Sequence, residues 1–286
     1  MNSPISEFLP PEYDANAPVA VLAGRGFYPK LMVDRIRKAG VPVRLISFVG
    51  ETSDELIDQF DSAHHQKIKV GQVGKLLKTL QNMGCRYNVM VGQIKPSRLF
   101  GGIHPDLKAF RILQQLKVRN AETIYGAVVK EMEQIGVQTL DARAFIDDQL
   151  ASPGLMTSGK WKLDDSTLEH GIRIANEIAR LDIGQGIVVK NGTVLCVEEF
   201  NGTDEMLKRA ANYKTSEKLF VKTVKPNQNY AIDVPVFGEK TIRSMVEGGV
   251  RHAALAVGKT IILDKKNVLE LARKEKINLF GFEHKG

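Results

Sequence analysis

The sequence predicts an α/β protein of two domains, an N-terminal Rossmann-like domain with a parallel sheet and helices, and a C-terminal α/β domain with a mixed sheet. With 286 residues the chain exceeds the usual size of a single hydrophobic core. Its first half alternates short apolar runs with helical periods, which is typical of a parallel sheet. In its second half, Asn191-Gly192 lies between two apolar runs, a pattern that predicts an antiparallel hairpin.

The first domain is expected to span residues 18–150. Residues 1–17 carry three prolines before any periodic segment, so we expect them to form a mobile or loosely docked arm outside the fold. The elements then follow in order: a strand over 19–22, a helix over 30–39 with Pro29 in its first turn, a strand over 41–49, a helix over 71–84, a strand over 87–94, and helices over 105–118 and 121–135.

The second domain is expected to span residues 164–286, after a linker over 151–163 that is rich in Pro, Gly and Ser. A helix beginning after Asp164 or Asp165 runs to Leu181, and the hairpin follows it. The remaining elements are a short helix over 203–212, a strand over 218–225, a helix over 240–249, strands over 252–257 and 259–264, a helix over 265–276 and a last strand over 277–283.

Composition excludes several classes of protein. No apolar run is long enough to span a membrane and no signal peptide is recognisable, so we expect a cytoplasmic protein. The two cysteines, Cys85 and Cys196, are too few for a disulfide framework. The formal charge of +7 favours anionic partners, but Lys and Arg form no basic block, so we expect no nucleic acid among them.

Most short motifs fail on inspection. Gly24-Arg25-Gly26 follows a strand, but Pro29 stands where a dinucleotide fingerprint needs its third glycine. Two interpretations stay open for this turn: a phosphate contact aided by Arg25, or a plain tight turn. Gly258-Lys259-Thr260 lacks the first glycine of a phosphate-binding loop, the histidines lack zinc-ligand spacing, and no serine-nucleophile motif is present.

Carboxylates near turns are the remaining candidates for chemistry. Asp182 ends a predicted helix, and Glu198, Glu199 and Asp204 lie between a strand and a helix, where Thr203 or Asp204 could also serve as an N-cap. Asp233 lies between Ile232 and Val234 before Pro235, which predicts a carboxylate at the end of a short strand. Such hard oxygen ligands suit Mg²⁺ or Mn²⁺ shared with a substrate phosphate.

Long segments of the chain resemble one family. "IARLDIGQGIVVKNGTVLCVEEFNGTDEMLKRA" and "KPNQNYAIDVPVFGEKTI" resemble the LpxI-type UDP-2,3-diacylglucosamine pyrophosphatases of Gram-negative bacteria. "LAGRGFYPKL" resembles the glycine-rich opening of that family, and "VGQIKPSRLF" its Gly-(Gln/Asn)-Val-x-(Arg/Lys)-Pro segment. The resemblance covers the chain apart from residues 1–17.

The resemblance implies hydrolysis of the pyrophosphate of UDP-2,3-diacylglucosamine to UMP and 2,3-diacylglucosamine 1-phosphate (lipid X) in lipid A biosynthesis. It also implies a divalent cation, Mg²⁺ or Mn²⁺, a substrate site between the two domains, and a homodimer. The chain would work in the cytoplasm, as a peripheral protein at the inner face of the inner membrane, where a basic surface suits anionic lipid.

The resemblance places the catalytic residue at Asp233, which aligns with the Asp that the family requires for activity. Asp233, Asp204 and Glu122 are the candidate metal ligands. The candidate substrate-binding residues are Gly24, Arg25, Gly26, Gln93, Lys95, Asp182, Gln185, Thr203, Lys225, Gln228 and Thr241.

The chain departs from the family pattern at two places. It reads Asn120-Ala121-Glu122 where the family has Gly-Asp-Asp, and Asn229 where the family tends to have Asp. Glu122 would partly replace a missing acid. The alternative is therefore a non-catalytic protein that binds a nucleotide sugar or nucleotide lipid on the same scaffold, whereas an oxidoreductase is disfavoured by the failed dinucleotide fingerprint.

Overall fold

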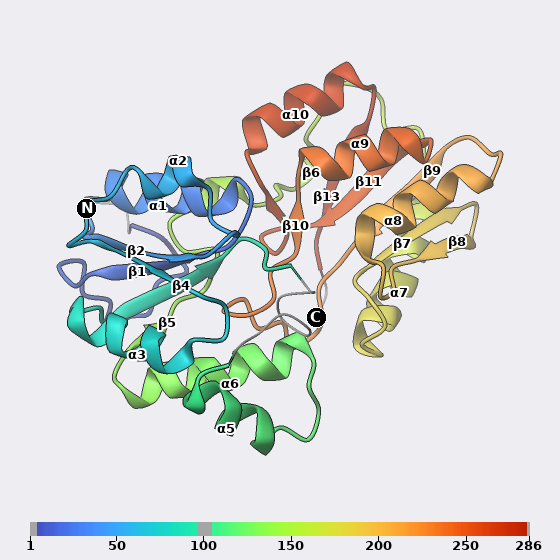
Figure 1. Cartoon of the computed structure of the whole chain (residues 1–286). Helices are drawn as coiled ribbons and strands as arrows, with labels where there is room; N and C mark the ends of the chain where they lie inside the picture. The colour runs from blue at the N-terminus through green and yellow to red at the C-terminus, as the bar shows by residue number, and fades with distance from the viewer. Residues whose placement is uncertain (1–4, 96–104, 285–286) are drawn as a thin grey trace. The chain divides into compact units, whose positions relative to one another are not determined.

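The computed structural model describes residues 5–95 and 105–284 and divides the chain into two compact units (Figure 1). Unit 1 comprises Met1–Asp147 and Asn229–Asp233, and unit 2 comprises Asp148–Gln228 and Val234–Gly286. The chain therefore passes from one unit to the other three times. The predicted fold class is confirmed, because unit 1 has a parallel sheet and unit 2 a mixed one.

Unit 1 is built on a five-stranded sheet of order β3-β2-β1-β4-β5, in which every pairing is parallel. This is the strand order of a Rossmann fold without its sixth strand. The strands are β1 Val19–Ala23, β2 Val43–Phe48, β3 His65–Ile68, β4 Tyr87–Val91 and β5 Gln138–Thr139. The sequence predicted β1, β2 and β4, whereas β3 and β5 carry too few apolar residues to show a strand pattern.

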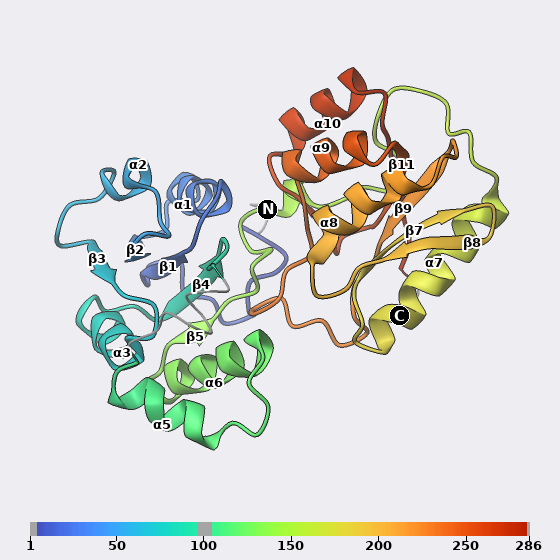
Figure 2. The same ribbon diagram turned by 45° about the vertical axis from the view of Figure 1, so that its right-hand side comes forward.

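Helices cover both faces of this sheet (Figures 1 and 2). One face packs against α1 Tyr28–Lys38, which buries Met32, Val33 and Ile36. On the other face lie α3 Val73–Asn82, α5 Leu107–Gln115 and α6 Ala121–Gln134, whose apolar stripes form one core with β1 and β2. A single turn of helix, α2 Asp54–Ile57, follows β2.

The N-terminal residues pack on unit 1, so the expectation of an arm outside the fold is wrong for residues 5–17. The ring of Tyr13 lies 4.8 Å from that of Tyr87 and 6.1 Å from that of Phe145. The guanidinium of Arg143 lies 4.2 Å from the ring of Phe8. These aromatic contacts hold the segment on unit 1 although its proline content predicts a loosely docked arm. Residues 1–4 of the predicted arm lie outside the described part of the chain.

Unit 2 is built on a six-stranded sheet of order β6-β13-β11-β9-β7-β8. Its strands are β6 Gly154–Leu155, β7 Gly186–Lys190, β8 Thr193–Val197, β9 Lys218–Lys222, β11 Val250–Ala256 and β13 Asn278–Phe282. Strands β9, β11 and β13 run parallel, and β7 and β8 form the predicted hairpin, with positive φ at Asn191 and Gly192. A separate pair joins β10 Val236–Phe237 to β12 Ile261–Ile262.

Two helical layers enclose the unit 2 sheet. Helix α7 Asp165–Arg180, capped by Asp164, packs on one face through Ala175. On the other face lie α8 Gly202–Arg209, α9 Glu239–Glu247 and α10 Lys265–Lys274, whose apolar side chains form a second core. Two turns of 3-10 helix are also present, η1 Asp147–Gln149 at the boundary between the units and η2 Ala210–Asn212 in unit 2.

The predicted linker over residues 151–163 is part of unit 2. It carries β6, which pairs with β13, and its ends Ala151 and Leu163 are buried. The Pro and Gly residues of this segment therefore lie at and next to an edge strand of the sheet, and the segment is not a flexible linker.

None of the helices in residues 5–95 and 105–284 has both the length and the hydropathy needed to cross a bilayer.

Candidate functional site

The turn after β1 is joined to the end of β4 by backbone hydrogen bonds. Arg25 N donates to Gln93 O (2.8 Å), and Gln93 N donates to Arg25 O (3.2 Å). A side chain at position 24 would bring its Cβ to 2.7 Å from Gln93 O, so this close approach requires Gly24. The structure thus brings together the predicted residues Gly24, Arg25, Gly26, Gln93 and Lys95 at the carboxyl ends of two neighbouring strands.

A buried carboxylate orients Arg25. Arg25 Nε lies 2.5 Å from Glu51 Oε2, and Arg25 Nη2 donates to Gly50 O (2.8 Å). The backbone N of Lys95 also donates to Glu51 Oε2 (3.4 Å). The side chain of Glu51 is fully buried, whereas that of Arg25 is 35% exposed, so Arg25 is fixed in direction yet accessible to an anion.

Asp233 follows a turn in the short segment that belongs to unit 1. Asn229 O accepts hydrogen bonds from Ile232 N (3.0 Å) and Asp233 N (2.9 Å), and Asn229 Oδ1 accepts one from Ala231 N (3.0 Å). The predicted short strand ending at Asp233 is therefore wrong, because the Asn229 side chain stabilises a turn in competition with extended backbone. Asp233 is half-buried, and β10 begins after Pro235.

Tyr230 anchors this turn to the body of unit 1. Its carbonyl accepts a hydrogen bond from Ala142 N (3.1 Å), and the guanidinium of Arg143 lies 3.5 Å from the centre of its ring. Burial raises the pKa of Tyr230 to about 12, with Arg143 acting in the opposite direction and the nearby charges of Asp141 and Asp233 adding to the rise. The candidate catalytic carboxylate is thus attached to a packed element on its N-terminal side.

In unit 2, predicted substrate-binding residues meet beyond the carboxyl end of β9. Lys225 Nζ lies 2.5 Å from Asp182 Oδ1, and Lys225 N donates to Gln228 Oε1 (3.1 Å). The carbonyl of Gln185 accepts a hydrogen bond from Thr223 N (2.9 Å). These contacts bring Asp182, Lys225 and Gln228 into one group, with Gln185 bonded to the same chain segment.

Beside this group lies a buried ion cluster, formed by Glu198, Thr203 and Lys222. Thr203 Oγ1 donates to Glu198 Oε1, and Lys222 Nζ donates to Thr203 Oγ1 (3.2 Å) and lies 3.8 Å from Glu198 Oε2. The side chain of Lys222 is only 7% exposed and that of Glu198 15%. Lys222 was not among the predicted residues, because a single lysine at the end of an apolar strand gives no sequence signal.

The predicted N-cap role of Thr203 or Asp204 is wrong. Helix α8 begins two or three residues earlier, with Asn201 at the N-cap position, so both residues lie inside its first turn. Thr203 bonds to Glu198 as described, and Asp204 Oδ2 lies 2.7 Å from Lys240 Nζ. A purely capping role therefore explains neither side chain.

The candidate metal ligands are divided between the two units. Glu122 is exposed in the first turn of α6 in unit 1, whereas Asp204 belongs to unit 2. Over residues 5–95 and 105–284, no three His, Cys, Asp or Glu side chains lie close enough to hold a metal ion by themselves. Such an arrangement fits Mg²⁺ only if a substrate phosphate supplies further oxygen ligands, which is the usual manner in phosphate chemistry.

Thr241, another predicted substrate-binding residue, lies in the first turn of α9 and is 7% exposed. Its burial indicates a packing role in the structure as it stands.

A Rossmann-like unit with a glycine turn and a fixed arginine at the carboxyl ends of its strands is typical of α/β proteins that bind phosphorylated ligands. Comparison with known proteins identifies the family. Residues 18–149 match the LpxI N-terminal domain and residues 152–280 the LpxI C-terminal domain, so the chain belongs to the LpxI family. The UDP-2,3-diacylglucosamine pyrophosphatase LpxI of Caulobacter vibrioides is 27% identical over 270 residues, which are 89% of this chain and 93% of that protein.

Proposed function

We propose that the chain hydrolyses the pyrophosphate of UDP-2,3-diacylglucosamine to UMP and 2,3-diacylglucosamine 1-phosphate, a step of lipid A biosynthesis. The match to both LpxI domain families over nearly the whole chain carries this proposal. The named substrate of the Caulobacter relative supplies the reaction.

The chemistry requires that the anionic oxygens of the pyrophosphate be neutralised and that a water molecule be aligned with one phosphorus. Arg25 and Lys225 are the candidate cations for neutralising the pyrophosphate oxygens. Each forms an ion pair with an acid that fixes its position. The Asp233 carboxylate aligns the water or holds the divalent cation, with Asp204 and Glu122 as further candidate ligands. Mg²⁺, when bound, supplies Lewis-acid stabilisation of the charge that develops on the phosphate oxygens.

Release of UMP from UDP-2,3-diacylglucosamine, with Mg²⁺ or with EDTA, tests the proposal. We expect Mg²⁺-dependent release in the wild type and a fall in kcat of about 10²–10³-fold in Asp233→Asn, because the substitution removes a charge at the reacting centre without changing its shape. Asp58→Asn removes an exposed acid at the end of α2 and is the matched control, with unchanged kcat. Full activity of Asp233→Asn would exclude the assigned role.

The second candidate is a binding protein without turnover. It is favoured by Ala121 and Asn229, each of which replaces an acid of the family pattern. In the structure Asn229 acts as a hydrogen-bond acceptor for Ala231 N, a role that Asp could fill equally well. Asn229 therefore differs from the Asp of the family pattern in charge and not in this hydrogen bond. Substrate binding without UMP release in Mg²⁺ or Mn²⁺ would select the binding protein.

We further propose that the chain works at the inner face of the inner membrane. The support is the surface of α5 and of the turn that follows it, called the α5 surface. It combines exposed apolar residues with cations: Leu107, Phe110, Val118, Arg111, Lys117 and Arg119. Phe110 is 50% and Leu107 78% exposed. Exposed apolar and basic side chains close together in the sequence suit the interface of an anionic bilayer. The homodimer implied by the resemblance is likewise a proposal, which light scattering of the purified chain tests.

A further inference from the structure

The N-terminal segment, residues 5–17, reaches the turn that carries Asp233 through one arginine. The guanidinium of Arg143 lies 4.2 Å from the centre of the Phe8 ring and 3.5 Å from that of the Tyr230 ring. Arg143 therefore bridges a residue near the start of the chain to Tyr230, which stands three positions before Asp233. All of these residues belong to unit 1.

Arg143 is held firmly enough to transmit a position. Its Nε donates to Asp141 Oδ1 (3.0 Å) and its Nη2 to Asp141 Oδ2 (2.6 Å), and two parallel bonds of this kind fix the plane of a guanidinium. Its side chain is only 15% exposed. Ala142 O accepts a hydrogen bond from the Tyr28 hydroxyl, and Ala142 N donates to Tyr230 O (3.1 Å). The cation therefore presents a fixed face to each ring that lies on it.

The N-terminal segment is attached to unit 1 on both sides of Phe8. Glu7 N donates to Asp147 Oδ1 (2.9 Å), and Asp14 N donates to Tyr87 Oη (3.0 Å). Phe8 itself is half-buried. The match to the family's N-terminal domain begins at residue 18, so Phe8 acts on Arg143 from outside the matched domain.

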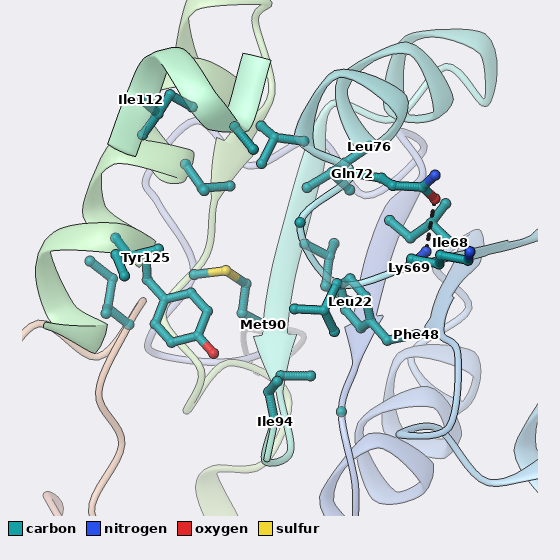
Figure 3. Close-up of a pocket in the computed structure, with 18 of the residues that line it drawn as sticks. Leu22, Phe48, Ile68, Lys69, Gln72, Leu76, Met90, Ile94, Ile112 and Tyr125 are labelled. Atoms are coloured by element: carbon teal, nitrogen blue, oxygen red, sulfur yellow. Dashed lines mark hydrogen bonds between the residues drawn. The ribbon is translucent and has the colours of Figure 1, made fainter. Parts of the chain in front are cut away.

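The other end of the turn has a looser anchor. Ile232, which directly precedes Asp233, lines an apolar cavity of about 170 Å³ together with Met90 and Tyr125 (Figure 3). A side chain that borders unfilled volume makes fewer packing contacts than one in a close-packed core, so it restrains its backbone less. The contacts of Tyr230 therefore provide the firmer restraint on this turn.

We propose that Phe8 and Arg143 are positioning residues for the hydrolysis. The N-terminal segment holds Arg143 against Tyr230, and Tyr230 sets the place of the Asp233 carboxylate. The inference rests on the proposed function, which assigns the reacting centre to Asp233. Because a displacement of about 1 Å at a reacting group can cost about 10²-fold in rate, a small shift of Tyr230 should be visible in kcat.

Variants of the full chain test this coupling. Phe8→Leu keeps an apolar side chain but removes the aromatic face, whereas Phe8→Tyr keeps the ring and is the conservative variant. Arg143→Met removes the cation through which Phe8 is proposed to act. Tyr13→Leu makes a similar change at another ring of the N-terminal segment, beside Tyr87, and is the matched control.

The UMP release assay should separate these variants. We expect kcat to fall about fivefold in Phe8→Leu and at least about tenfold in Arg143→Met, with KM within about twofold of the wild type. Phe8→Tyr and Tyr13→Leu should keep the wild-type kcat. In the Arg143→Met background Phe8→Leu should lower kcat no further, because the two residues act in series.

Three results would overturn the inference. The first is a kcat of Phe8→Leu within about twofold of the wild type. The second is an equal fall in kcat caused by Phe8→Leu with and without the Arg143 guanidinium. The third is an equal fall in Tyr13→Leu, which would indicate a general loss of stability.

Hydrogen exchange gives a readout that does not depend on activity. The amides of Ile232 and Asp233 are hydrogen-bonded to Asn229 O, and their exchange should be about fivefold faster in Phe8→Leu and unchanged in Tyr13→Leu. If UMP is not released but exchange follows this pattern, the proposed reaction fails and the coupling stands. If UMP is released and neither kcat nor exchange responds to Phe8→Leu, the reaction stands and the coupling fails.

Discussion

The Lys222→Met substitution tests the buried ion cluster of unit 2. It keeps the length of the side chain but removes the cation 3.8 Å from Glu198 Oε2, which makes no hydrogen bond within the described part of the chain. At an effective dielectric constant of about 20 the attraction across this distance is about 4 kcal/mol, and a buried carboxylate that loses its partner typically costs 3–5 kcal/mol. Because Glu198 is 15% exposed, we expect the free energy of unfolding to fall by an amount at the lower end of this range, about 3 kcal/mol.

Urea unfolding of the full chain, followed by tryptophan fluorescence, measures this loss. Trp161 is the single tryptophan and packs in unit 2, 5.0 Å from the ring of Phe280 and 5.2 Å from that of His252, so it reports on that unit. With an m-value of about 2 kcal/mol/M, the midpoint should fall by about 1.5 M. The double variant Lys222→Met/Glu198→Gln should recover most of the loss, because no charge then remains buried.

A more exposed ion pair of the same unit provides the control for Lys222→Met. Lys190→Met breaks an ion pair with Glu217 whose acid is 46% exposed, and should cost less than about 1 kcal/mol. The reasoning is refuted if Lys222→Met costs no more than this control, or if the double variant is no more stable than the single one.

Three further predictions concern the turn, the membrane and pH. Gly24→Ala should abolish UMP release without changing the circular dichroism spectrum, because its Cβ would lie 2.7 Å from Gln93 O. Gly126→Ala in α6 is its control. The new Cβ would make only an ordinary van der Waals contact, so this variant should be active and more stable by up to about 1 kcal/mol. Phe110→Ser should weaken sedimentation with anionic vesicles about tenfold; equal sedimentation of wild type and variant would contradict a role for the α5 surface. Burial lowers the pKa of His252, so protonation favours the unfolded chain, and the unfolding free energy of unit 2 should fall as pH drops below about 6.5, less steeply in His252→Gln.

Elements set by neighbouring residues could be predicted from the sequence. Asn191-Gly192 determines its hairpin through local backbone preference, and Pro29 marks the first turn of α1. The packing of Tyr13 on Tyr87 could not be predicted in this way, because it joins residues far apart in the chain and depends on the completed sheet.

The candidate site shows the same division. The glycine turn and Asp233 could be singled out from their local sequence, but the Asp233 backbone follows a turn that only the Asn229 side chain explains. Glu51 could not be identified beforehand, because its partner Arg25 lies at the end of a different strand and only the parallel pairing of β1 and β2 brings them together. Ion pairs across strands leave no periodic signal in a sequence.

The short return of the chain to unit 1 at Asn229–Asp233 bears on whether the two halves can exist apart. A fragment ending near residue 149, where the match to the first family domain ends, would lack Tyr230 over Arg143 and Ile232 in its apolar core. Such a fragment should fold poorly alone and should be rescued by a peptide spanning these five residues and their neighbours. We therefore do not expect the two halves to be exchangeable between relatives at residue 149. A chimaera of two family members should keep the apolar core of unit 1 intact only if residues 229–233 come from the parent that supplies the first half.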